Sequence, residues 1–553
     1  MALFSLFSLI LLCLLQPSSG ASIPATPKAI VCAADSRHFI SNDSDSNIWP
    51  WQAYRSSSAQ PPVLQTDRTG EALFNGLLFF DVAPGAAITA AKQISPYVMT
   101  DTGDLVWSGP TGPSYNVRVQ EYNGAPVLTH FSGEGTAGAS AVVGHGYGGV
   151  IVRDTSYNVI ARVCPKLNHF TMETGVTAEC HADLHESFIT PRNTMLVTAY
   201  NTTRADLTSV GGPKDGWILD SMAVELNITT GEVLFLWSPL AHLPLNKSHF
   251  SLAGIGAGQG HNQSVPWDFF HINAIELVGE NYLINSRHYW STFLVNPQGK
   301  ILWEINGLDG GDFGKLPEGA AFSWQHFARV QSINSTQAVI SWFGNNNYLP
   351  DLGDMKPTTG VTLQLTLPPD PSSPPVLITN LTDPALRVDA WSQGSFLHLP
   401  NGNMFMGYGS DPVMVEYGPP EKGATVANAR WSATFGYGDL VSSYRSYKQV
   451  WHATPATNPD LIVLEAEAND QLHCAGNSTY RGYVSWNGAT DVTAWMVYAG
   501  ATNNSLNAVG RAMKFGFETE FAVPNDAMFV QVGAIENTGN TVVRKSRVVA
   551  AGK

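Results

Sequence analysis

Short runs of β-branched and aromatic residues, bounded by Gly, Pro, Asn or Asp, are the feature of this 553-residue chain that most limits its fold. Such runs lie at residues 149–152, 195–200, 282–285, 338–343 and 404–408. Runs of this length between turn-forming residues are typical of β-strands. No long window shows the 3.6-residue periodicity of an amphipathic helix. The sequence therefore predicts an all-β fold.

Three segments repeat one pattern, which consists of a turn, a glycine, apolar residues and a tryptophan. They are TDTGDLVW, ITTGEVLFLW and NPQGKILW, and they end at Trp107, Trp237 and Trp303. Each is typical of a hairpin whose second strand ends in a core tryptophan. A hairpin that recurs along a chain indicates a β-propeller, in which each repeat belongs to one blade.

A second repeat places a histidine before a turn and a strand, at His185, His271, His326 and His398. The innermost strands of a propeller line a central channel, so side chains from different blades converge there although they are distant in sequence. We expect His185, His271 and His326 to share one site. His398 lies beside an LPNG turn, and we expect it to be structural.

The residue pattern changes at about residue 456. The segments SWNGATDVTAWMVYAG and GFETEFAVPNDAMFVQVGAIENTG resemble a fibronectin type III sandwich, with Trp486, Trp495 and Tyr498 on its early strands. The sequence therefore predicts a propeller over residues 21–455 and a β-sandwich over residues 456–553.

The first twenty residues are an apolar run that ends in small residues, which is typical of a secretory signal peptide cleaved near Gly20 or Ala21. The apolar core of this run is too short to span a bilayer comfortably, so we expect a mature protein without a membrane anchor. Nine N-x-[ST] sequons follow, at Asn42, Asn201, Asn227, Asn246, Asn262, Asn334, Asn380, Asn477 and Asn503. Together they predict a secreted protein that carries N-glycans.

The cysteines and the charge agree with this localisation. Signal cleavage leaves Cys32, Cys164, Cys180 and Cys474, and we expect Cys164 to pair with Cys180 because they are close in sequence. Lys and Arg number 30 against 45 Asp and Glu, for a net charge of −15. This balance argues against nucleic acid as a partner, because no useful basic patch can be assembled.

The residues that could carry chemistry are densest between 268 and 329. In order they are His-x-Asn at 271–273, Ser-Arg-His at 286–288, Gly-Lys-x-x-Trp at 299–303 and Trp-Gln-His at 324–326. This order resembles the secreted arylsulfotransferase family of six-bladed propellers, particularly its fungal branch. Further matches are GDLVWSGP, GHGYGG, DLHESFITP, GSFLHLPNGNMFMGYGS and YVSWNGATDVTAW, so the resemblance covers nearly the whole mature chain.

The resemblance implies transfer of a sulfuryl group from an aryl sulfate to a phenolic acceptor, through a transiently sulfated histidine and without a nucleotide donor or cofactor. His326 matches the family's nucleophile, and His271 with Asn273 matches its second axial histidine and the following asparagine. Arg287 and His185 match its arginine and its upstream histidine, and we expect Arg287 and Asn273 to orient and stabilise the sulfuryl oxygens. One departure is Phe327, which stands where relatives commonly carry an acidic or small residue and which leaves the substrate range open.

The residue types suit that chemistry independently of the resemblance. A neutral imidazole is a nucleophile near pH 7, and a guanidinium stabilises the negative charge of sulfuryl oxygens as it rearranges. His271 or His185 could act as the acid and base for the phenolic oxygens. Aromatic side chains near these positions could hold an aryl ring between them, and the candidates are Phe270, Trp290 and Trp324.

Two rival interpretations remain at this stage. The chain could be a non-catalytic extracellular propeller that binds phenolic or carbohydrate ligands. Alternatively, the three imidazoles could hold copper or zinc, although Arg287 beside them argues against a metal. Arg287 could also simply pair with Asp268 or Glu276, and the glycines around His145 could serve only a tight turn.

Overall fold

The computed structural model of the chain describes residues 30–41, 48–84, 90–135, 144–252, 258–348, 355–382, 385–420, 424, 426–438, 440–466, 478–536 and 541–551. The expected signal peptide, residues 1–20, and Cys474 lie outside these ranges. The described residues form strands and only four short 3-10 helices, so the predicted all-β fold is confirmed. None of their helices is long and apolar enough to cross a membrane.

Six antiparallel sheets follow one another along the described chain, and together they are called the six-sheet unit below. Sheet 1 contains β6 (Leu77–Pro84), β7 (Ser95–Met99), β8 (Leu105–Ser108), β29 (Val441–Ser442) and β30 (Tyr447–Gln449). Sheet 2 contains β9 (Ser114–Tyr122), β10 (Ala125–Gly135), β11 (Gly146–Arg153) and β12 (Val159–Val163). Sheet 3 contains β13 (Ser187–Ile189), β14 (Thr194–Ala205), β15 (Gly216–Asn227) and β16 (Val233–Trp237).

The remaining three sheets repeat this four-strand order. Sheet 4 contains β17 (Ile272–Val278), β18 (Asn281–Ser286), β19 (Ser291–Val295) and β20 (Ile301–Asn306). Sheet 5 contains β21 (His326–Ile333), β22 (Gln337–Gly344), β23 (Thr359–Thr366) and β24 (Val376–Leu381). Sheet 6 contains β25 (Ser395–His398), β26 (Met404–Gly407), β27 (Val413–Tyr417), β28 (Ala429–Thr434) and β5 (Gln65–Arg68).

Smaller elements connect these sheets. Strands β3 (His38–Ile40) and β4 (Trp51–Ala53) form a two-stranded sheet near the start of the chain. The 3-10 helices are η1 (Thr208–Val210), η2 (Pro239–Ala241), η3 (Leu245–Lys247) and η4 (Gly311–Phe313).

The two ends of the six-sheet unit pair with each other. The early strand β5 pairs with β28 of sheet 6, while the late strands β29 and β30 pair with β6 of sheet 1. Each end of the segment therefore completes a sheet that the other end begins. Neighbouring sheets also contact each other through their first strands, for example β9 with β13, β17 with β21 and β21 with β25.

The repeated tryptophan segments are the outer hairpins of three different sheets. Their turns join β7 to β8, β15 to β16 and β19 to β20. The glycine of each turn, at Gly103, Gly231 and Gly299, has a φ of 87°, 72° and 81°, a region that glycine enters without steric cost. Trp107, Trp237 and Trp303 are buried, so their predicted place in the core is confirmed.

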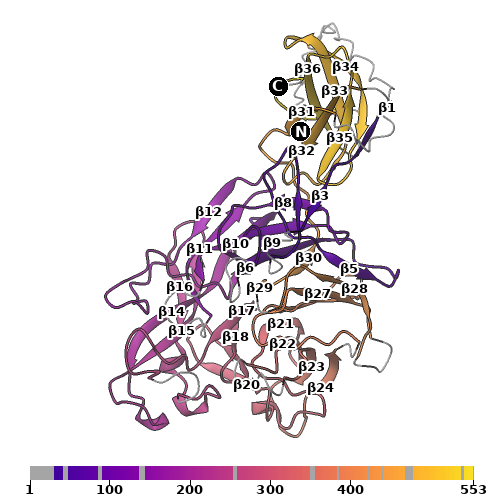
Figure 1. Cartoon of the computed structure of the whole chain (residues 1–553). Coiled ribbons are helices and arrows are strands. Elements are labelled where there is room, and N and C mark those ends of the chain that lie inside the picture. The colour runs from indigo at the N-terminus through magenta and orange to yellow at the C-terminus, as the bar shows by residue number, and fades with distance from the viewer. Residues whose placement is uncertain are drawn as a thin grey trace, which may run out of the picture.

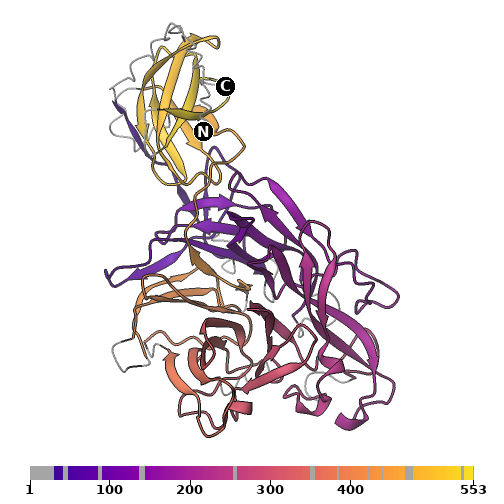
Figure 2. The same cartoon turned by 180° about the vertical axis from the view of Figure 1, so that it is seen from behind.

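Two further sheets lie at one end of the molecule, where the yellow strands stand apart from the six-sheet unit (Figures 1 and 2). One contains β31 (Asp460–Glu465), β32 (Tyr480–Ser485), β35 (Glu518–Val523) and β2 (Ala33–Asp35). The other contains β33 (Val492–Thr502), β34 (Ser505–Met513), β36 (Phe529–Glu536), β37 (Val542–Lys545), β38 (Val549–Ala550) and β1 (Ile30–Val31). They are called the C-terminal sheets below.

The first described strands belong to the C-terminal sheets. β1 runs parallel to β34, and β2 pairs antiparallel with β35. Residues 30–35 therefore lie with strands that follow residue 456, although the sequence assigned residues 21–455 to the preceding domain. The boundary at 455 itself stays a prediction, because nothing tests where the two domains separate.

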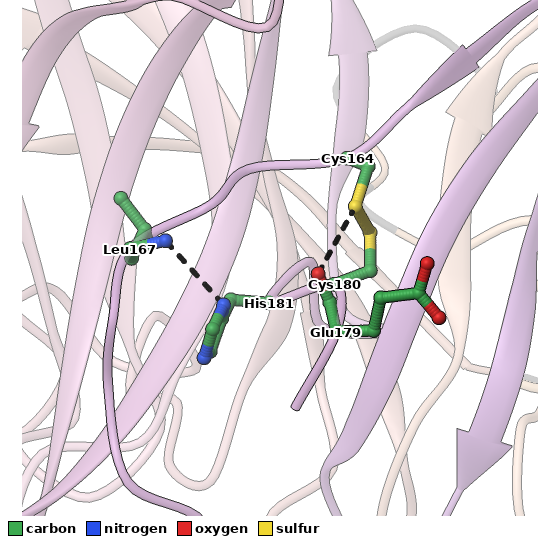
Figure 3. The surroundings of a disulfide bond; sticks show 5 residues. All are labelled: Cys164, Leu167, Glu179, Cys180 and His181. Carbon is green, nitrogen blue, oxygen red and sulfur yellow. Dashed lines mark hydrogen bonds between the residues drawn. A yellow bond between two sulfur atoms is a disulfide. The ribbon is translucent and has the colours of Figure 1, made fainter. Parts of the chain in front are cut away.

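A disulfide fixes the segment that leads from sheet 2 to sheet 3. Cys164 and Cys180 are bonded across a sequence separation of 16, as the sequence predicted (Figure 3). Beside the disulfide, the backbone N–H of Leu167 donates to Nδ1 of His181 at 3.4 Å. The bond thereby restrains the chain just before His185.

Candidate active site

Two of the predicted histidines lie face to edge at the starts of neighbouring sheets. His185 precedes β13 and His271 precedes β17, and their ring centroids are 4.8 Å apart at an interplanar angle of 86°. In each, Nδ1 donates a hydrogen bond to a buried carboxylate close in sequence, Asp183 for His185 and Asp268 for His271. A hydrogen bond from Nδ1 to a carboxylate fixes the ring and leaves Nε2 as the nitrogen that can accept or release a proton.

Burial and nearby charges shift the pKa values of His271 and of Asp183, the partner of His185. Burial lowers the pKa of His271 well below its ordinary value, and the nearby His185 and Arg287 lower it further, so His271 is neutral near pH 7. Burial opposes ionisation of Asp183, but His185 and the backbone N–H of Gly146 outweigh it and lower the Asp183 pKa to about 2. The ionised Asp183 accepts the Nδ1 hydrogen bond of His185.

Arg287 lies beside this pair and is held by three neighbours. Its Nη1 donates to Nε2 of His288 at 2.9 Å, its Nη2 donates to the carbonyl of Trp391 at 3.1 Å, and its guanidinium lies 5.1 Å from the centre of the Trp324 ring. Burial lowers the pKa of Arg287 to about 10, which still leaves it cationic near pH 7. No ion pair joins Arg287 to Asp268 or Glu276 within 4 Å among the described residues.

His326 begins β21 on the next sheet. Its Nδ1 donates to Oδ1 of Asn345 at 2.7 Å, because the amide nitrogen of Asn345 already donates to the carbonyls of Ala390 and Gln393. The backbone N–H of Gln393 donates a hydrogen bond to Nε2 at 3.3 Å, so Nε2 carries the lone pair. Burial, followed by the charge of Arg287, lowers the pKa of His326 well below its ordinary value. A neutral imidazole with its lone pair on Nε2 is a nucleophile.

Asn273 holds the backbone next to His326. Its side-chain Nδ2 donates to the carbonyl of Gln325 at 2.8 Å, and its Oδ1 accepts from Asn285 at 2.6 Å. Both ends of the amide are therefore in use within the protein. The expected contact of Asn273 with sulfuryl oxygens stays a prediction, whereas its hydrogen bonds place it as a support for residues 325–326.

The aromatic candidates lie in different surroundings. Trp324 stacks on Tyr348 at 4.4 Å and meets Trp290 edge to face at 5.4 Å, so these three rings form one surface beside Arg287. Phe270 instead packs against core rings, including Trp237. The guanidinium carbons of Arg329 and Arg445 lie 4.2 and 5.0 Å from the centre of the Phe327 ring.

Several residues at the starts of these strands have a left-handed backbone. His271, Trp290, Trp324, Phe327 and Gln393 have φ values between 52° and 63°. This region costs a bulky residue about 1–3 kcal/mol, and such residues gather at active sites where the surroundings enforce them. The strain therefore marks the same place as the histidines.

Comparison with known proteins identifies the family. A model of the family described as Arylsulfotransferase (ASST) matches residues 118–430, which is more than half of the chain. The chain belongs to the arylsulfotransferase (ASST) family. Membership supports a sulfotransferase enzyme, and the matched span contains His185, His271, Arg287 and His326. No curated protein matches the chain.

Solved structures resemble this arylsulfotransferase family member only distantly. A protein of unknown function from Bacteroides caccae aligns with a TM-score of 0.34 and 11% identity over 68% of this chain and 99% of its own. The GH43 protein BlXynB from Bacillus licheniformis aligns with a TM-score of 0.28 and 8% identity, over 78% of this chain and 88% of its own. Sucrose-6-phosphate hydrolase from Lactobacillus gasseri aligns at 0.26 and 12%, over 80% and 86%. None of these alignments supports an inference about this chain.

One group near the arylsulfotransferase histidines has the composition of a metal site. The ligand atoms of Asp268, His271 and His288 lie within 4.8 Å of one another. However, Nδ1 of His288 is hydrogen-bonded to the carbonyl of Asp268 at 2.5 Å, and its Nε2 accepts from Arg287. Both nitrogens of His288 are thus in use, and a guanidinium occupies the place of a cation. The group fits a hydrogen-bonded network rather than a metal ion.

Sequence reasoning missed several residues of the site. Asp183 and Asp268 orient the histidine pair, and their positions two or three residues before a histidine were the available signal. His288 follows Arg287 directly in the Ser-Arg-His motif, but the sequence suggested a role only for the arginine. Tyr444 lies far outside the motifs, and no sequence signal pointed to it.

His145 and His398 have opposite surroundings. His145 is fully buried, lies 5.3 Å from the Tyr200 ring, and neither of its ring nitrogens has a hydrogen-bond partner among the described residues. His398 is exposed and contacts Thr362 at 3.2 Å, away from the histidine pair. His145 therefore belongs with the site, and His398 does not.

Proposed function

We propose that this protein is a secreted aryl sulfate:phenol sulfotransferase that works through a transient sulfohistidine at His326. It takes a small aromatic sulfate ester as donor and a phenol as acceptor, and it needs no cofactor. The six-sheet unit is a six-bladed β-propeller, supported by the pairing of its two ends. The C-terminal sheets are a fibronectin-like sandwich, supported by the apolar core that the two sheets share. The signal-like first twenty residues and the sequons support secretion and N-glycosylation.

The observation that carries this proposal is the state of His326. Its Nδ1 donates to Asn345, its Nε2 holds the lone pair, and burial keeps the ring neutral. Arg287 lies near enough for its positive charge to act on His326. A neutral nucleophile next to a fixed cation suits attack on an anionic sulfuryl group.

In the first step, Nε2 of His326 attacks the sulfur of the donor. An N–S bond forms, the bond between sulfur and the aryl oxygen breaks, and the electron pair leaves with the phenolate. His185, beside the ionised Asp183, gives a proton to that phenolate oxygen. Arg287 stabilises the three sulfuryl oxygens, whose negative charge is redistributed as the bonds change.

The second step reverses the first with a different phenol. The acceptor hydroxyl returns a proton to His185, and its oxygen attacks the sulfur of sulfohistidine 326. An S–O bond forms, the N–S bond breaks, and the electron pair returns to Nε2 of His326. His185 and His326 end in their starting states, so the cycle consumes only donor and acceptor.

The test uses p-nitrophenyl sulfate as donor with and without added phenol. We expect nitrophenol release that accelerates when phenol is present, and a mass increase of one sulfuryl group on the peptide that contains His326. His326→Asn should abolish both. His398→Asn is the matched control, because it removes an exposed histidine outside the site and should leave turnover unchanged.

Two results would contradict the proposal. If the folded wild-type protein releases no phenol from any aryl sulfate, it is a binding protein rather than a transferase. If His326→Asn keeps its turnover while remaining folded, another residue is the nucleophile. Copper or zinc that copurifies with the protein and is lost on substitution of His271 would instead favour a metal site.

A further inference from the structure

The segment between β29 and β30 brings one more side chain to the histidines. Tyr444 lies in the connection between these two late strands, which complete sheet 1, and outside the residues matched by the family model. Its ring centroid is 5.3 Å from that of His185 at 90°, and 6.4 Å from that of His326 at 76°. Tyr444 therefore lies between the proposed acid–base and the proposed nucleophile.

The position of Tyr444 is fixed from both sides. Its backbone N–H donates to Oδ2 of the buried Asp81 at 3.1 Å, and the guanidinium of Arg445 lies 5.2 Å from its ring centre. Arg445 is itself held by an ion pair with Glu186 and by a hydrogen bond to the carbonyl of Asn273. The tyrosine ring is thus placed by a rigid, fully buried network.

The hydroxyl of Tyr444 is the unusual part. The residue is 2% exposed, and its hydroxyl oxygen has no hydrogen-bond partner among the described residues. Buried polar atoms are nearly always paired, so an unpaired hydroxyl needs an explanation. The neighbouring Tyr200 shows the ordinary arrangement, because its hydroxyl donates to the carbonyl of Ile272 at 3.0 Å.

Other unpaired atoms lie around the same place. They are the two ring nitrogens of His145, Nε of Arg287 and Oδ1 of Asp268. Burial raises the pKa of Tyr444, so its hydroxyl keeps its proton and remains a hydrogen-bond donor. Two of these unpaired atoms, the hydroxyl of Tyr444 and Nε of Arg287, are hydrogen-bond donors, and donors beside a nucleophile are what a site for an anionic ester requires.

We propose that Tyr444 is a further catalytic residue, whose O–H donates a hydrogen bond to the aryl oxygen of the sulfate ester as the bond between sulfur and that oxygen breaks. The proton stays on Tyr444, and His185 supplies the one that the phenolate finally carries. This inference rests on the proposed transferase function. The hydroxyl stays unpaired without substrate because its partner is the oxygen on which charge develops.

The test is Tyr444→Phe, measured with a series of aryl sulfates. Phenyl sulfate leaves as a strongly basic phenolate and should lose about 100-fold in kcat, in line with the loss of one donor to a developing oxyanion. The p-nitrophenyl ester leaves as a much weaker base and should lose less than about tenfold. Plotted against the basicity of the leaving phenolate, log kcat should therefore fall more steeply for the variant.

Stability separates a catalytic role from a structural one. Removing an unpaired buried hydroxyl leaves no partner unsatisfied, so Tyr444→Phe should keep or raise the Tm. Tyr200→Phe is the matched control, because it strands the Ile272 carbonyl and should lower the Tm without changing the dependence on leaving group. A lowered Tm in Tyr444→Phe with an unchanged leaving-group dependence would overturn the proposal.

The activity of the wild-type protein separates failure of the proposed transferase function from failure of the role of Tyr444. If it turns over no aryl sulfate, both the proposed function and the role of Tyr444 fail. If it is active and Tyr444→Phe loses equally with every donor or not at all, only the role of Tyr444 fails.

Discussion

The six-sheet unit contains a buried charged cluster beside its apolar cores, whereas the core shared by the C-terminal sheets is mainly apolar. In the six-sheet unit, Glu186 is fully buried and pairs with three guanidiniums, those of Arg118, Arg329 and Arg445. The C-terminal sheets enclose mainly apolar side chains, among them Val463, Val484, Trp495, Phe521 and Val532. Both units are all-β, so strand content does not separate them.

The buried charged cluster lies next to the candidate active site. An apolar core gains free energy simply by leaving water, whereas buried charges are costly unless every one is paired. The charged network of the six-sheet unit leads directly to the site, because Glu186 follows His185 and Arg445 follows Tyr444. A polar interior is thus tolerated where it positions chemistry. Among their described residues, the C-terminal sheets bury one carboxylate fully, that of Glu518, which accepts hydrogen bonds from the hydroxyls of Ser36 and Ser56.

The largest expected effect comes from removing the charge of Glu186. Burial opposes its ionisation, yet the guanidiniums of Arg329, Arg445 and Arg118 outweigh it and lower the Glu186 pKa to about 2. Glu186→Gln leaves three buried cations without their counter-charge and should cost about 3–5 kcal/mol of unfolding free energy. Urea denaturation measures this cost.

Glu280→Gln is the control for that substitution. Glu280 is exposed and pairs with the surface residue Arg192, so its loss should cost less than about 1 kcal/mol. Equal costs for Glu186→Gln and Glu280→Gln would show that the buried cluster around Glu186 contributes no more to stability than a surface ion pair.

A substitution in the C-terminal sheets should lower stability without touching chemistry. Phe521 is fully buried, and its ring fills the space over Gly482, where an added Cβ would lie 2.2 Å from it. Phe521→Ala should cost about 3 kcal/mol through the cavity that it leaves. Turnover of p-nitrophenyl sulfate per folded molecule should stay unchanged, and a fall in that turnover would show that the C-terminal sheets support the site.

The smallest expected effect is on the pH dependence of the unfolding free energy, through His326 of the six-sheet unit. The folded-state pKa of His326 lies well below its ordinary value because of burial and Arg287, while the unfolded chain takes up this proton near pH 6.5. As pH falls below 6.5 the unfolded state gains protons that the folded state does not, so stability is lost on acidification. Asn takes up no proton at position 326, so the His326→Asn variant should lose less unfolding free energy on acidification than the wild type.

The measurement compares unfolding free energies of wild type and His326→Asn at pH 7 and pH 5. The variant should gain on the wild type by at most about 1.4 kcal/mol per pH unit below 6.5, the value for one proton. An identical difference at both pH values would mean that His326 takes up its proton equally in the folded and unfolded states, so that burial does not lower its pKa.

Much of this architecture could be predicted from local pattern. The tryptophan hairpins were recognisable because a glycine with positive φ and a buried aromatic residue are local requirements of a tight turn and its strand. The Cys164–Cys180 bond followed from proximity in sequence. The placement of β1 and β2 was not predictable, because a short edge strand carries no local sign of which distant sheet it joins.

The histidine site was predicted only in part for a similar reason. His185 and His271 lie before first strands of neighbouring sheets, and their recurrence in the sequence suggested that they meet. Asn273 matched a family motif, yet its amide is used by Gln325 and Asn285, which are hydrogen-bond partners that only the folded chain brings together. Tyr444 reaches His185 across a separation of more than 250 residues, because the last strands pair with β6.

The sequence by itself determined the strands, the outer hairpins, the disulfide and the histidines that could carry chemistry, because each depends on residue types within a few positions of one another. The folded chain was needed to show which nitrogen of His326 carries the lone pair, which polar atoms stay unpaired and which part of the chain completes sheet 1. Those properties depend on burial and on hydrogen bonds between distant segments.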